Sequence, residues 1–388
     1  MRDVPLFRSF FIGGFECSTH RRADGRRLDM VAATGHDRHV AADYRRLREH
    51  GILTAREGLR WHLIERSPGH YDFSSVLPFV RAAHALGIQV TWDLCHYGWP
   101  DGLDVFSPDF VRRFAGLARA FTSLVKNETD TTPFFAPINE ISFFAWAGGD
   151  MGDINPGCTG RADDLKAQLV RAAIAGTEAI WSVDRTARIC HVDPTFHVIP
   201  RSADPTDIRD ASLFRELQFE TWDMLAGRQR PELGGRPDYL DIVGVNYYPW
   251  NQWIYVNKLE AGPTVYRGHP EYRPFQGLLA EVYARYQRPV FVAETGTEGD
   301  ARPDWLRYVG EETQAARRAG IPVDGICLYP IVNFPGWDDD RHCHNGLWDY
   351  ADPHGGRIVY EPLARELRRQ QTLFEPDQKE GRSVQAAP

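Results

Sequence analysis

FFAPINEISFFAW, at residues 134–146, is a short apolar run that changes abruptly into Asn139-Glu140 and then into aromatic residues. This pattern predicts a buried strand that delivers an amide and a carboxylate at its C-terminal end. Burial of a carboxylate is costly unless the group is paired or has a chemical role. A second apolar run, RPVFVAETGT at residues 288–297, ends in a single glutamate, Glu294. We therefore expect Glu140 and Glu294 to face each other across one pocket.

A repeated helix–strand period surrounds these two runs. Three times a helical pattern ends at a glycine and leads directly into a strand pattern, at Gly51, Gly87 and Gly320. Glycine readily adopts the left-handed conformation that ends a helix, and a β-branched residue after it favours a strand. We expect strands near residues 8–15, 52–58, 88–94, 134–139, 187–192, 240–246, 289–294 and 324–332. Helices are expected at 38–49, 74–86, 108–125, 163–181, 211–226, 275–287 and 304–319.

The predicted strands are apolar throughout, as expected of strands that are buried on both faces. Eight such strands alternating with helices favour a single α/β domain, a closed parallel (β/α)8 TIM barrel. An open doubly wound sheet is the alternative, but no glycine-rich phosphate turn follows the first strands. We assign residues 1–369 to the catalytic barrel and residues 370–388 to a polar, frayed C-terminal tail.

The helix after the third strand has a clear predicted start. Ser107 is a good N-cap residue, and Pro108 suits the first helical position. Two long loops, at residues 146–162 and 247–274, are rich in Gly, Pro and aromatic residues. In a barrel we expect them to build the pocket at the C-terminal face.

Composition excludes several classes of partner. The chain has 388 residues and a formal net charge of −8, and no basic run is interleaved with aromatic residues, so neither nucleic acid nor a membrane surface is an expected partner. The six cysteines include no Cys-x-x-Cys pair, and the N-terminus has no signal-peptide pattern, which predicts reduced thiols and a cytoplasmic protein. The oligomeric state is left open.

Two glutamates at the mouth of a barrel can hydrolyse a glycoside in two ways. At a separation of roughly 5 Å, one carboxylate attacks the anomeric carbon while the other protonates the leaving oxygen, with retention of configuration. At about 6.5–9.5 Å, a water fits between them and the configuration inverts. Both outcomes stay open on the residues alone, as does a purely structural ion pair with an arginine.

The chain resembles the clan A glycoside hydrolases and is most similar to glycoside hydrolase family 1, the β-glucosidase family. That family ends its fourth strand with Thr-x-Asn-Glu-Pro and its seventh with Thr-Glu-Asn-Gly, where this chain has Pro-Ile-Asn-Glu-Ile and Ala-Glu-Thr-Gly. The resemblance implies that Glu140 is the acid/base and Glu294 the nucleophile of a retaining exo-β-glycosidase. It also implies that Asn139 holds the 2-hydroxyl of a small glycoside substrate, and that no cofactor is needed.

The resemblance extends to other strand ends. Arg56, in AREGLRW, stands where the family has an arginine beside the nucleophile, and His96, in VTWDLCHYGWP, matches a histidine that contacts the glycone. VGVNYY at residues 243–248 resembles the family's Asn-Tyr-Tyr strand, so Asn246 and Tyr248 would support Glu294.

The first and eighth strands depart from the family pattern. ICLYPIVNFPGW at residues 326–337 resembles the eighth-strand region, where Tyr329 would precede a cis peptide bond and Trp337 would contact substrate. However, Asn-Phe-Pro-Gly-Trp replaces the family's Asn-Phe-Glu-Trp, and ECSTHRR at residues 16–22 lacks its glutamine. We therefore expect a divergent sugar-binding subsite, with the identity of the sugar left open.

Two alternatives belong to other functional classes. A non-catalytic sugar-binding barrel would keep the pocket without turnover, although it has no need of a supported nucleophile. A metal-dependent hydrolase on the same fold is the other, but the sequence lacks the His-Glu-x-x-His spacing. His342, Cys343 and His344 are a cluster that could chelate, although a polar loop is the simpler interpretation. We predict no metal site.

Overall fold

The structure is a computed structural model that describes residues 5–374. Eight parallel strands close into one barrel in the order β1-β11-β10-β7-β5-β4-β3-β2. The barrel is closed because β1 pairs with both β2 and β11, which rules out the open sheet and confirms the (β/α)8 prediction. Its strands are β1 (Phe11–Gly14), β2 (Thr54–Gly58), β3 (Gln89–Cys95), β4 (Phe134–Ile138), β5 (Arg188–Pro194), β7 (Ile242–Asn246), β10 (Val290–Thr295) and β11 (Val323–Leu328).

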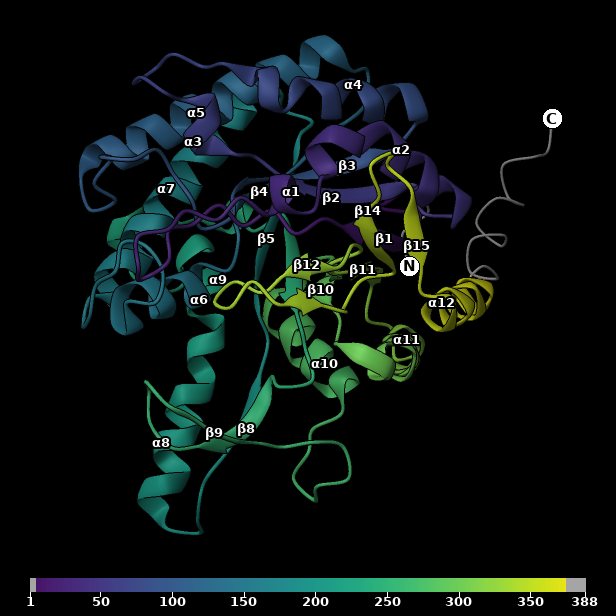
Figure 1. Ribbon diagram of the computed structural model, residues 1–388. Coiled ribbons are helices and arrows are strands. Elements are labelled where there is room, and N and C mark those ends of the chain that lie inside the picture. Colours follow the sequence, from purple (N-terminus) through teal and green to yellow (C-terminus); the bar gives the residue numbers. More distant parts are fainter. Residues whose placement is uncertain (1–4, 375–388) are drawn as a thin grey trace, which may run out of the picture.

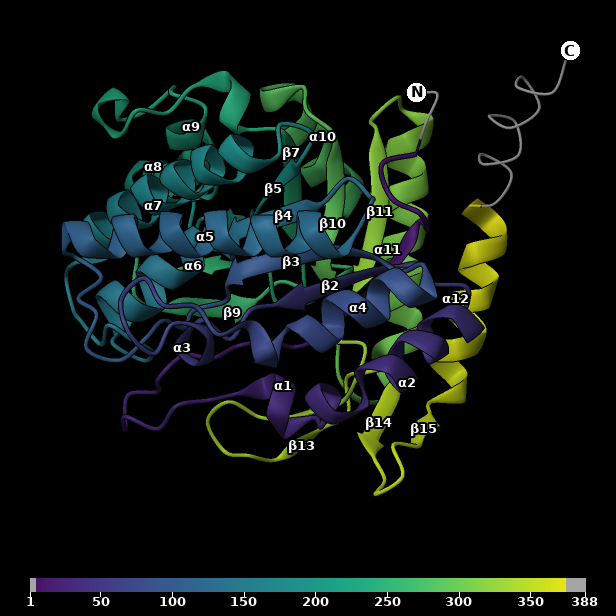
Figure 2. The ribbon, with the colours of Figure 1, turned by 90° about the horizontal axis from the view of Figure 1, so that it is seen from above.

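Helices form a layer around the barrel (Figure 1 and Figure 2). The longer ones are α2 (His36–Glu49), α4 (Leu77–Leu86), α5 (Pro108–Glu128), α7 (Ala162–Val183), α8 (Pro205–Glu216), α10 (Phe275–Tyr286), α11 (Arg302–Arg318) and α12 (Glu361–Phe374). Short helices are α1 (Met30–Ala33), α3 (Trp61–Ile64), α6 (Ile141–Ala145) and α9 (Glu220–Leu225), and a π-helical turn, η2 (Trp146–Met151), follows α6. The 3-10 turns are η1 (Phe73–Ser75), η3 (Leu217–Phe219), η4 (Pro231–Leu233), η5 (Pro237–Tyr239) and η6 (Gly299–Ala301). No helix within residues 5–374 is both long and apolar enough to cross a membrane.

Helix ends follow the predicted glycine pattern. Gly51, Gly87 and Gly320 all have positive φ, and each directly follows a helix or its C-cap residue. The predicted start of α5 is confirmed, with Ser107 as the N-cap residue and Pro108 as the first helical residue, although the Ser107 hydroxyl donates to the carbonyl of Asp104 at 2.7 Å and does not cap a helix N–H.

The predicted helix at residues 211–226 is wrong in its bounds. The structure starts α8 at Pro205, where the Asp204 side chain accepts from Thr206 N at 2.7 Å, and η3 separates α8 from α9. The Asp-Pro pair is a helix start signal that apolar spacing alone does not show.

The predicted domain boundary after residue 369 falls inside α12. Gln370 and Phe374 are buried, and the Phe374 ring stacks on Phe10 with centroids 4.0 Å apart. Residues 370–374 therefore belong to the barrel layer, beside α11 (Figure 2). The rest of the predicted tail, residues 375–388, lies outside the described residues.

The barrel interior is packed below the strand ends. Phe7 contacts Phe134 and Phe291, with ring centroids 5.5 and 5.1 Å apart, where β4 and β10 begin. Cys190 and Cys327 belong to the same buried cluster, as small apolar residues. All six cysteines of the chain are free. A packed interior leaves the carboxyl ends of the strands as the place for chemistry.

Excursions from the barrel form three small sheets. β6 (His197–Ile199), β8 (Gln252–Tyr255) and β9 (Ala261–Thr264) form a three-stranded sheet that projects with α8 away from the barrel (Figure 1). The loop at residues 247–274 therefore contributes to the site only in part: β8 and β9 project outward, whereas Tyr248 donates to Glu294 and the Lys258 carbonyl accepts from Trp146 Nε1 at 3.2 Å. The other two sheets are the pair β12 (Phe334–Pro335) and β13 (His342–Cys343) and the pair β14 (Trp348–Ala351) and β15 (Arg357–Val359).

Candidate active site

Glu140 and Glu294 lie at the carboxyl ends of β4 and β10. Asn246, the last residue of β7, pairs with Glu294 in the strand register and donates to Glu140 Oε1 from Nδ2 at 2.9 Å. Asn246 therefore contacts one of the two carboxylates through its side chain and lies beside the residue that carries the other. Glu140 has φ 45°, a left-handed conformation that turns the chain from β4 into α6. Such backbone strain in a residue other than glycine is typical of functional sites.

Glu294 is held by one donor on each oxygen. Arg56 Nη1 donates to Oε1 at 2.7 Å, and the Tyr248 hydroxyl donates to Oε2 at 2.8 Å. Arg56 is buried and also binds both oxygens of Asp93, at 3.1 and 2.7 Å. Burial opposes the charge on Arg56, but Asp93 and Glu294 outweigh it and raise its pKa well above the usual value. A permanent cation therefore contacts Glu294.

Glu140 has a different environment. Its Oε1 accepts from Asn246, and its Oε2 accepts a short hydrogen bond from the Tyr97 hydroxyl. No cation contacts it among the ion pairs of residues 5–374. Burial, and then the charge of Glu294, raise the pKa of Glu140 to about 8. A carboxyl group in this state holds its proton at neutral pH and can act as an acid.

The Asn139 amide has a fixed orientation. Arg56 Nη2 donates to its Oδ1 at 2.6 Å, so its Nδ2 is directed at Tyr97 Oη, 2.9 Å away, and at His96 Nε2, 3.2 Å away. His96 Nδ1 lies 3.0 Å from Asp93 Oδ2. Burial opposes a charge on His96, whereas Cys17 and Asp93 favour it and raise the pKa of His96. The geometry outweighs this direction: because the Arg56 contact turns the Asn139 Nδ2 group toward Nε2, that nitrogen must accept, and we assign the neutral ring with its proton on Nδ1.

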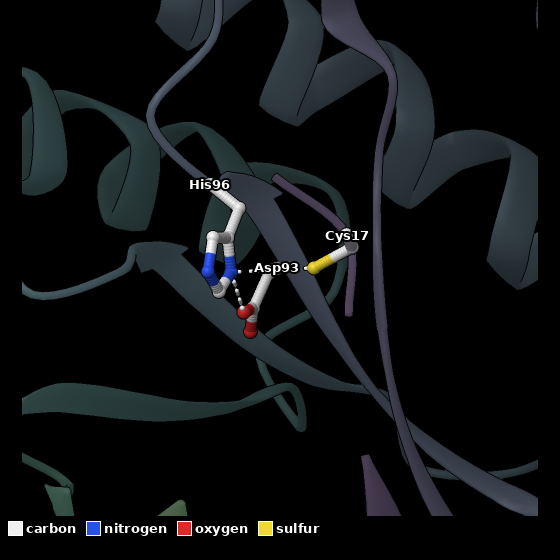
Figure 3. A group of neighbouring side chains, drawn as sticks. All are labelled: Cys17, Asp93 and His96. Atoms are coloured by element: carbon white, nitrogen blue, oxygen red, sulfur yellow. Dashed lines mark hydrogen bonds and ion pairs between the residues drawn. The ribbon is translucent and has the colours of Figure 1, made fainter. Parts of the chain in front are cut away.

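Figure 3 shows the group formed by Cys17, Asp93 and His96. One ligand-type atom of each lies within 4.8 Å of the others, and Cys17 Sγ is 3.2 Å from His96 Nδ1. Both Asp93 oxygens contact the Arg56 guanidinium, which would repel a cation, and burial raises the pKa of Cys17 to about 11. These residues therefore do not fit a metal ion, for which the thiol must ionise.

A second group with metal-binding side chains is exposed. His342 and His344 lie on or beside β13, and Asp349 lies in β14. The His342 Nε2 atom is 2.7 Å from Asp349 Oδ1, and the His342 ring stacks between His344 and Tyr350. These contacts join β13 to β14.

The two aromatic residues from the eighth-strand region also lie at the site. The Tyr329 hydroxyl is 3.7 Å from Cys17 Sγ, the Tyr329 ring lies under the Arg56 guanidinium at 5.3 Å, and the bond after Tyr329 is cis as predicted. The Trp337 ring lies 4.6 Å from His20 and 5.8 Å from Tyr97. The structure thus brings together all nine predicted residues: Arg56, His96, Asn139, Glu140, Asn246, Tyr248, Glu294, Tyr329 and Trp337.

Tyr97 is the contact that sequence reasoning missed. It directly follows His96, has φ 68°, is buried, and joins the Asn139 amide to Glu140. Asn155 Nδ2 donates to the Tyr97 carbonyl at 2.9 Å, so the loop at residues 146–162 holds the Tyr97 turn in place. The sequence signal that could have identified Tyr97 is a phenol in the segment directly after a barrel strand.

Comparison with known proteins gives no matching family model and no similar curated sequence, but it gives solved structures of the same architecture. The family 1 β-glucosidase from Thermotoga maritima superposes with a TM-score of 0.76 over 95% of this chain and 99% of its own, at 16% identity. The chain has the fold of the family 1 β-glucosidases. The β-glucosidase in complex with glucoimidazole gives a TM-score of 0.75 at 16% identity, covering 95% of this chain and 99% of its own. The AHE enzyme from Alicyclobacillus herbarius gives 0.76 at 16% identity, covering 96% and 99%.

Proposed function

We propose that this protein is a retaining exo-β-glycosidase that hydrolyses a small β-glycoside by double displacement. The unequal environments of the two glutamates carry the proposal. Glu294 contacts a guanidinium and a phenol, whereas Glu140 is buried without a cation and has a pKa raised to about 8. A retaining glycosidase needs this pair, one carboxylate that attacks and one acid that gives a proton.

In the first step, a Glu294 oxygen forms a bond to the anomeric carbon as the bond to the leaving oxygen breaks. Glu140 gives its proton to that oxygen, so the aglycone leaves as a neutral alcohol or phenol. The products are a glycosyl ester on Glu294 and an ionised Glu140. Arg56 and Tyr248 fix the two oxygens of Glu294 before reaction, which lowers the cost of reaching the reactive geometry.

In the second step, Glu140 accepts a proton from water. The water oxygen attacks the anomeric carbon, the ester bond breaks, and Glu294 is released as a carboxylate. Proton transfer from Asn246 or Asn139 is not involved, because both amides serve as fixed hydrogen-bond partners.

We favour retention over inversion because both oxygens of Glu294 are occupied by donors that orient it. An inverting enzyme uses the second carboxylate as a base on a water, with about 6.5–9.5 Å between the carboxyl groups. Here Asn246 contacts Glu140 directly and lies opposite Glu294 in the register, which supports a closer pair.

A small substrate suits the accessibility of the site. Glu140 is 9% exposed and Glu294 is 4% exposed, so little of either carboxylate meets solvent. We also propose that the protein acts in the cytoplasm, since its six cysteines are free.

The test is hydrolysis of a panel of aryl β-glycosides by the wild type and three variants. Glu294→Gln and Glu140→Gln should each lose most of the turnover of whichever glycoside the wild type cleaves. Glu232→Gln is the matched control, since Glu232 is exposed and its ion-pair partner within the described part of the chain is Arg230. The proposal fails if the two site variants cleave the substrate as fast as the control does.

A further inference from the structure

Two histidines lie on one face of a strand at the surface. His342 belongs to β13 and His344 directly follows that strand, and both are exposed. Side chains two positions apart on a strand project from the same face. The two imidazole rings accordingly stack with centroids 4.4 Å apart, whereas Cys343 between them is buried. The strand thus presents two imidazoles together to solvent.

Asp349, on β14, brings a carboxylate to the two rings. One ligand-type atom of each of the three residues lies within 4.8 Å of the others, and His342 Nε2 is 2.7 Å from Asp349 Oδ1. β13 and β14 lie at the same edge of the molecule (Figure 2). Two imidazoles and a carboxylate are ligands that Zn²⁺ binds, and here they come from two separate strands.

The carboxylate and one of the rings are already held in place. Tyr350 N and Asn333 Nδ2 donate to Asp349 Oδ1 at 2.7 and 3.1 Å. Burial opposes the charge on Asp349, but these hydrogen bonds and His342 outweigh it and lower the pKa of Asp349. The Tyr350 ring stacks on the His342 ring with centroids 4.1 Å apart. Neighbours that fix the orientation of the ligands are typical of metal sites.

The charges around Asp349 are compatible with a bound cation. Its ion-pair partner within residues 5–374 is His342, itself one of the three ligand-type residues. The adjoining arginine, Arg341, is paired with the carboxylates of Glu298 and Asp339. Among the described residues no guanidinium therefore pairs with the Asp349 carboxylate, in contrast to the buried group in Figure 3.

The hairpin that carries the two histidines is short. β12 and β13 have two residues each, with Phe334 opposite Cys343 and Pro335 opposite His342. A two-stranded hairpin of this size is marginally stable by itself. A ligand that joins its second strand to β14 would add a cross-link where backbone pairing is weakest.

We propose that His342, His344 and Asp349 bind one divalent transition-metal ion, with Zn²⁺ as the expected ion, and that the ion ties the β12–β13 hairpin to β14. Water completes the coordination, since three protein ligands leave a position open. This departs from the sequence-based prediction of no metal site. The inference does not rest on the proposed function, because none of the three residues contacts Glu140 or Glu294 through the hydrogen bonds of residues 5–374.

The experiment is calorimetry of Zn²⁺ and Mg²⁺ binding to the full chain without an affinity tag, after treatment with EDTA and its removal. We expect one Zn²⁺ per wild-type chain, bound about 100-fold or more tighter than Mg²⁺, which prefers oxygen ligands. His342→Ala, His344→Ala and Asp349→Asn should each weaken Zn²⁺ about tenfold or more. At pH 5.5 the wild type should also bind Zn²⁺ about tenfold weaker than at pH 7.5, because protons compete for the imidazole nitrogens.

Two control variants separate this group from other histidines and from the buried group. His84 is exposed and lies 3.8 Å from Asp130, but within residues 5–374 this pair belongs to no group of three ligand-type residues. His84→Ala should therefore bind Zn²⁺ as the wild type does, and so should Cys17→Ala, which alters the group in Figure 3.

Thermal unfolding tests whether the ion stabilises the fold. Zn²⁺ should raise the melting temperature of the wild type and leave that of His344→Ala unchanged, because a ligand that binds only the folded state stabilises it. His344 is exposed, so its replacement keeps the test valid even if Asp349→Asn does not fold. The inference is overturned if Zn²⁺ binds no tighter than Mg²⁺, if His342→Ala and His344→Ala keep the wild-type affinity, or if Cys17→Ala alone loses it.

Discussion

The two ends of the candidate site differ in how completely the protein satisfies its own polar groups. At the catalytic end, each oxygen of Glu140 and Glu294 accepts a hydrogen bond from the protein. At the other end, no residue within 5–374 forms an ion pair with Glu16 or a hydrogen bond with His20 Nδ1 or Trp337 Nε1. The two carboxylates are thus already oriented for chemistry, whereas the unpartnered polar atoms at the other end, like Asn246 Oδ1 beside Glu140, are available to a ligand.

The largest expected effect comes from breaking the catalytic network at its centre. Arg56→Met would leave Asp93 buried without its cation and free one oxygen of Glu294 and the Asn139 amide. We expect a loss of about 3–5 kcal/mol in the free energy of unfolding, and a fall in kcat/KM of about 1,000-fold or more. Urea denaturation and hydrolysis rates check both values.

The matched control for that change is Arg112→Met, since Arg112 is exposed and pairs with Asp109 on the helix surface. It should shift neither quantity measurably. The contacts of Arg56 do not organise the site if Arg56→Met has the same free energy of unfolding as this control and a kcat/KM within tenfold of the wild-type value.

Tyr97→Phe should have a smaller effect that appears mainly in the pH profile. The wild type should lose kcat/KM as pH rises through about 8, because Glu140 then gives up its proton. The Tyr97 hydroxyl donates to Glu140 and so favours the ionised form. Its removal should raise the pKa of Glu140 further, moving the basic limb to higher pH by about one unit, and should lower kcat about tenfold.

Tyr272→Phe is the control for Tyr97, because the Tyr272 hydroxyl bonds to those of Tyr247 and Tyr308, and neither hydroxyl has a hydrogen bond to the carboxylate of Glu140 or Glu294 among residues 5–374. Its basic limb should coincide with that of the wild type. If the basic limb of the pH profile of Tyr97→Phe coincides with that of the wild type, Tyr97 does not act through Glu140.

The smallest expected effect concerns Cys17, at the boundary between the two ends. Cys17→Ala removes a thiol that contacts His96 and Tyr329 but neither glutamate. We expect kcat/KM to change by less than about threefold.

Activity should also survive EDTA, because Arg56 occupies the oxygens of Asp93. Loss of activity in both experiments would instead assign a metal to the group in Figure 3.

The same contrast explains what the sequence could predict. The catalytic end follows from strand ends: Asn139, Glu140, Asn246 and Glu294 each stand at or just after an apolar run, and a parallel barrel must bring such ends together. Strands such as β4 and β10 were predictable for the same reason, since their apolar runs are nearly continuous, whereas β2 (TAREG) followed from the glycine that ends the helix before it.

The end of the site that contains Glu16, His20 and Trp337 is built by loops, and local sequence patterns do not predict where loops lie. Glu16 is held by backbone hydrogen bonds of its neighbours to Arg56 and His96, and these contacts join three separate segments. Tyr97 reaches Glu140 only because its backbone adopts positive φ. The missed α12 is similar, because the burial of Phe374 depends on Phe10, over 360 residues earlier in the sequence.

The most direct test of the central claim is to trap the reaction intermediate with a 2-fluoro aryl β-glycoside built on a sugar that the wild type cleaves. The account predicts time-dependent loss of activity in the wild type and a covalent glycosyl ester on Glu294, found by mass spectrometry of the digested protein, with no adduct in Glu294→Gln. Attachment to Glu140 or to another residue would contradict the account. So would a product of inverted configuration released without any covalent intermediate.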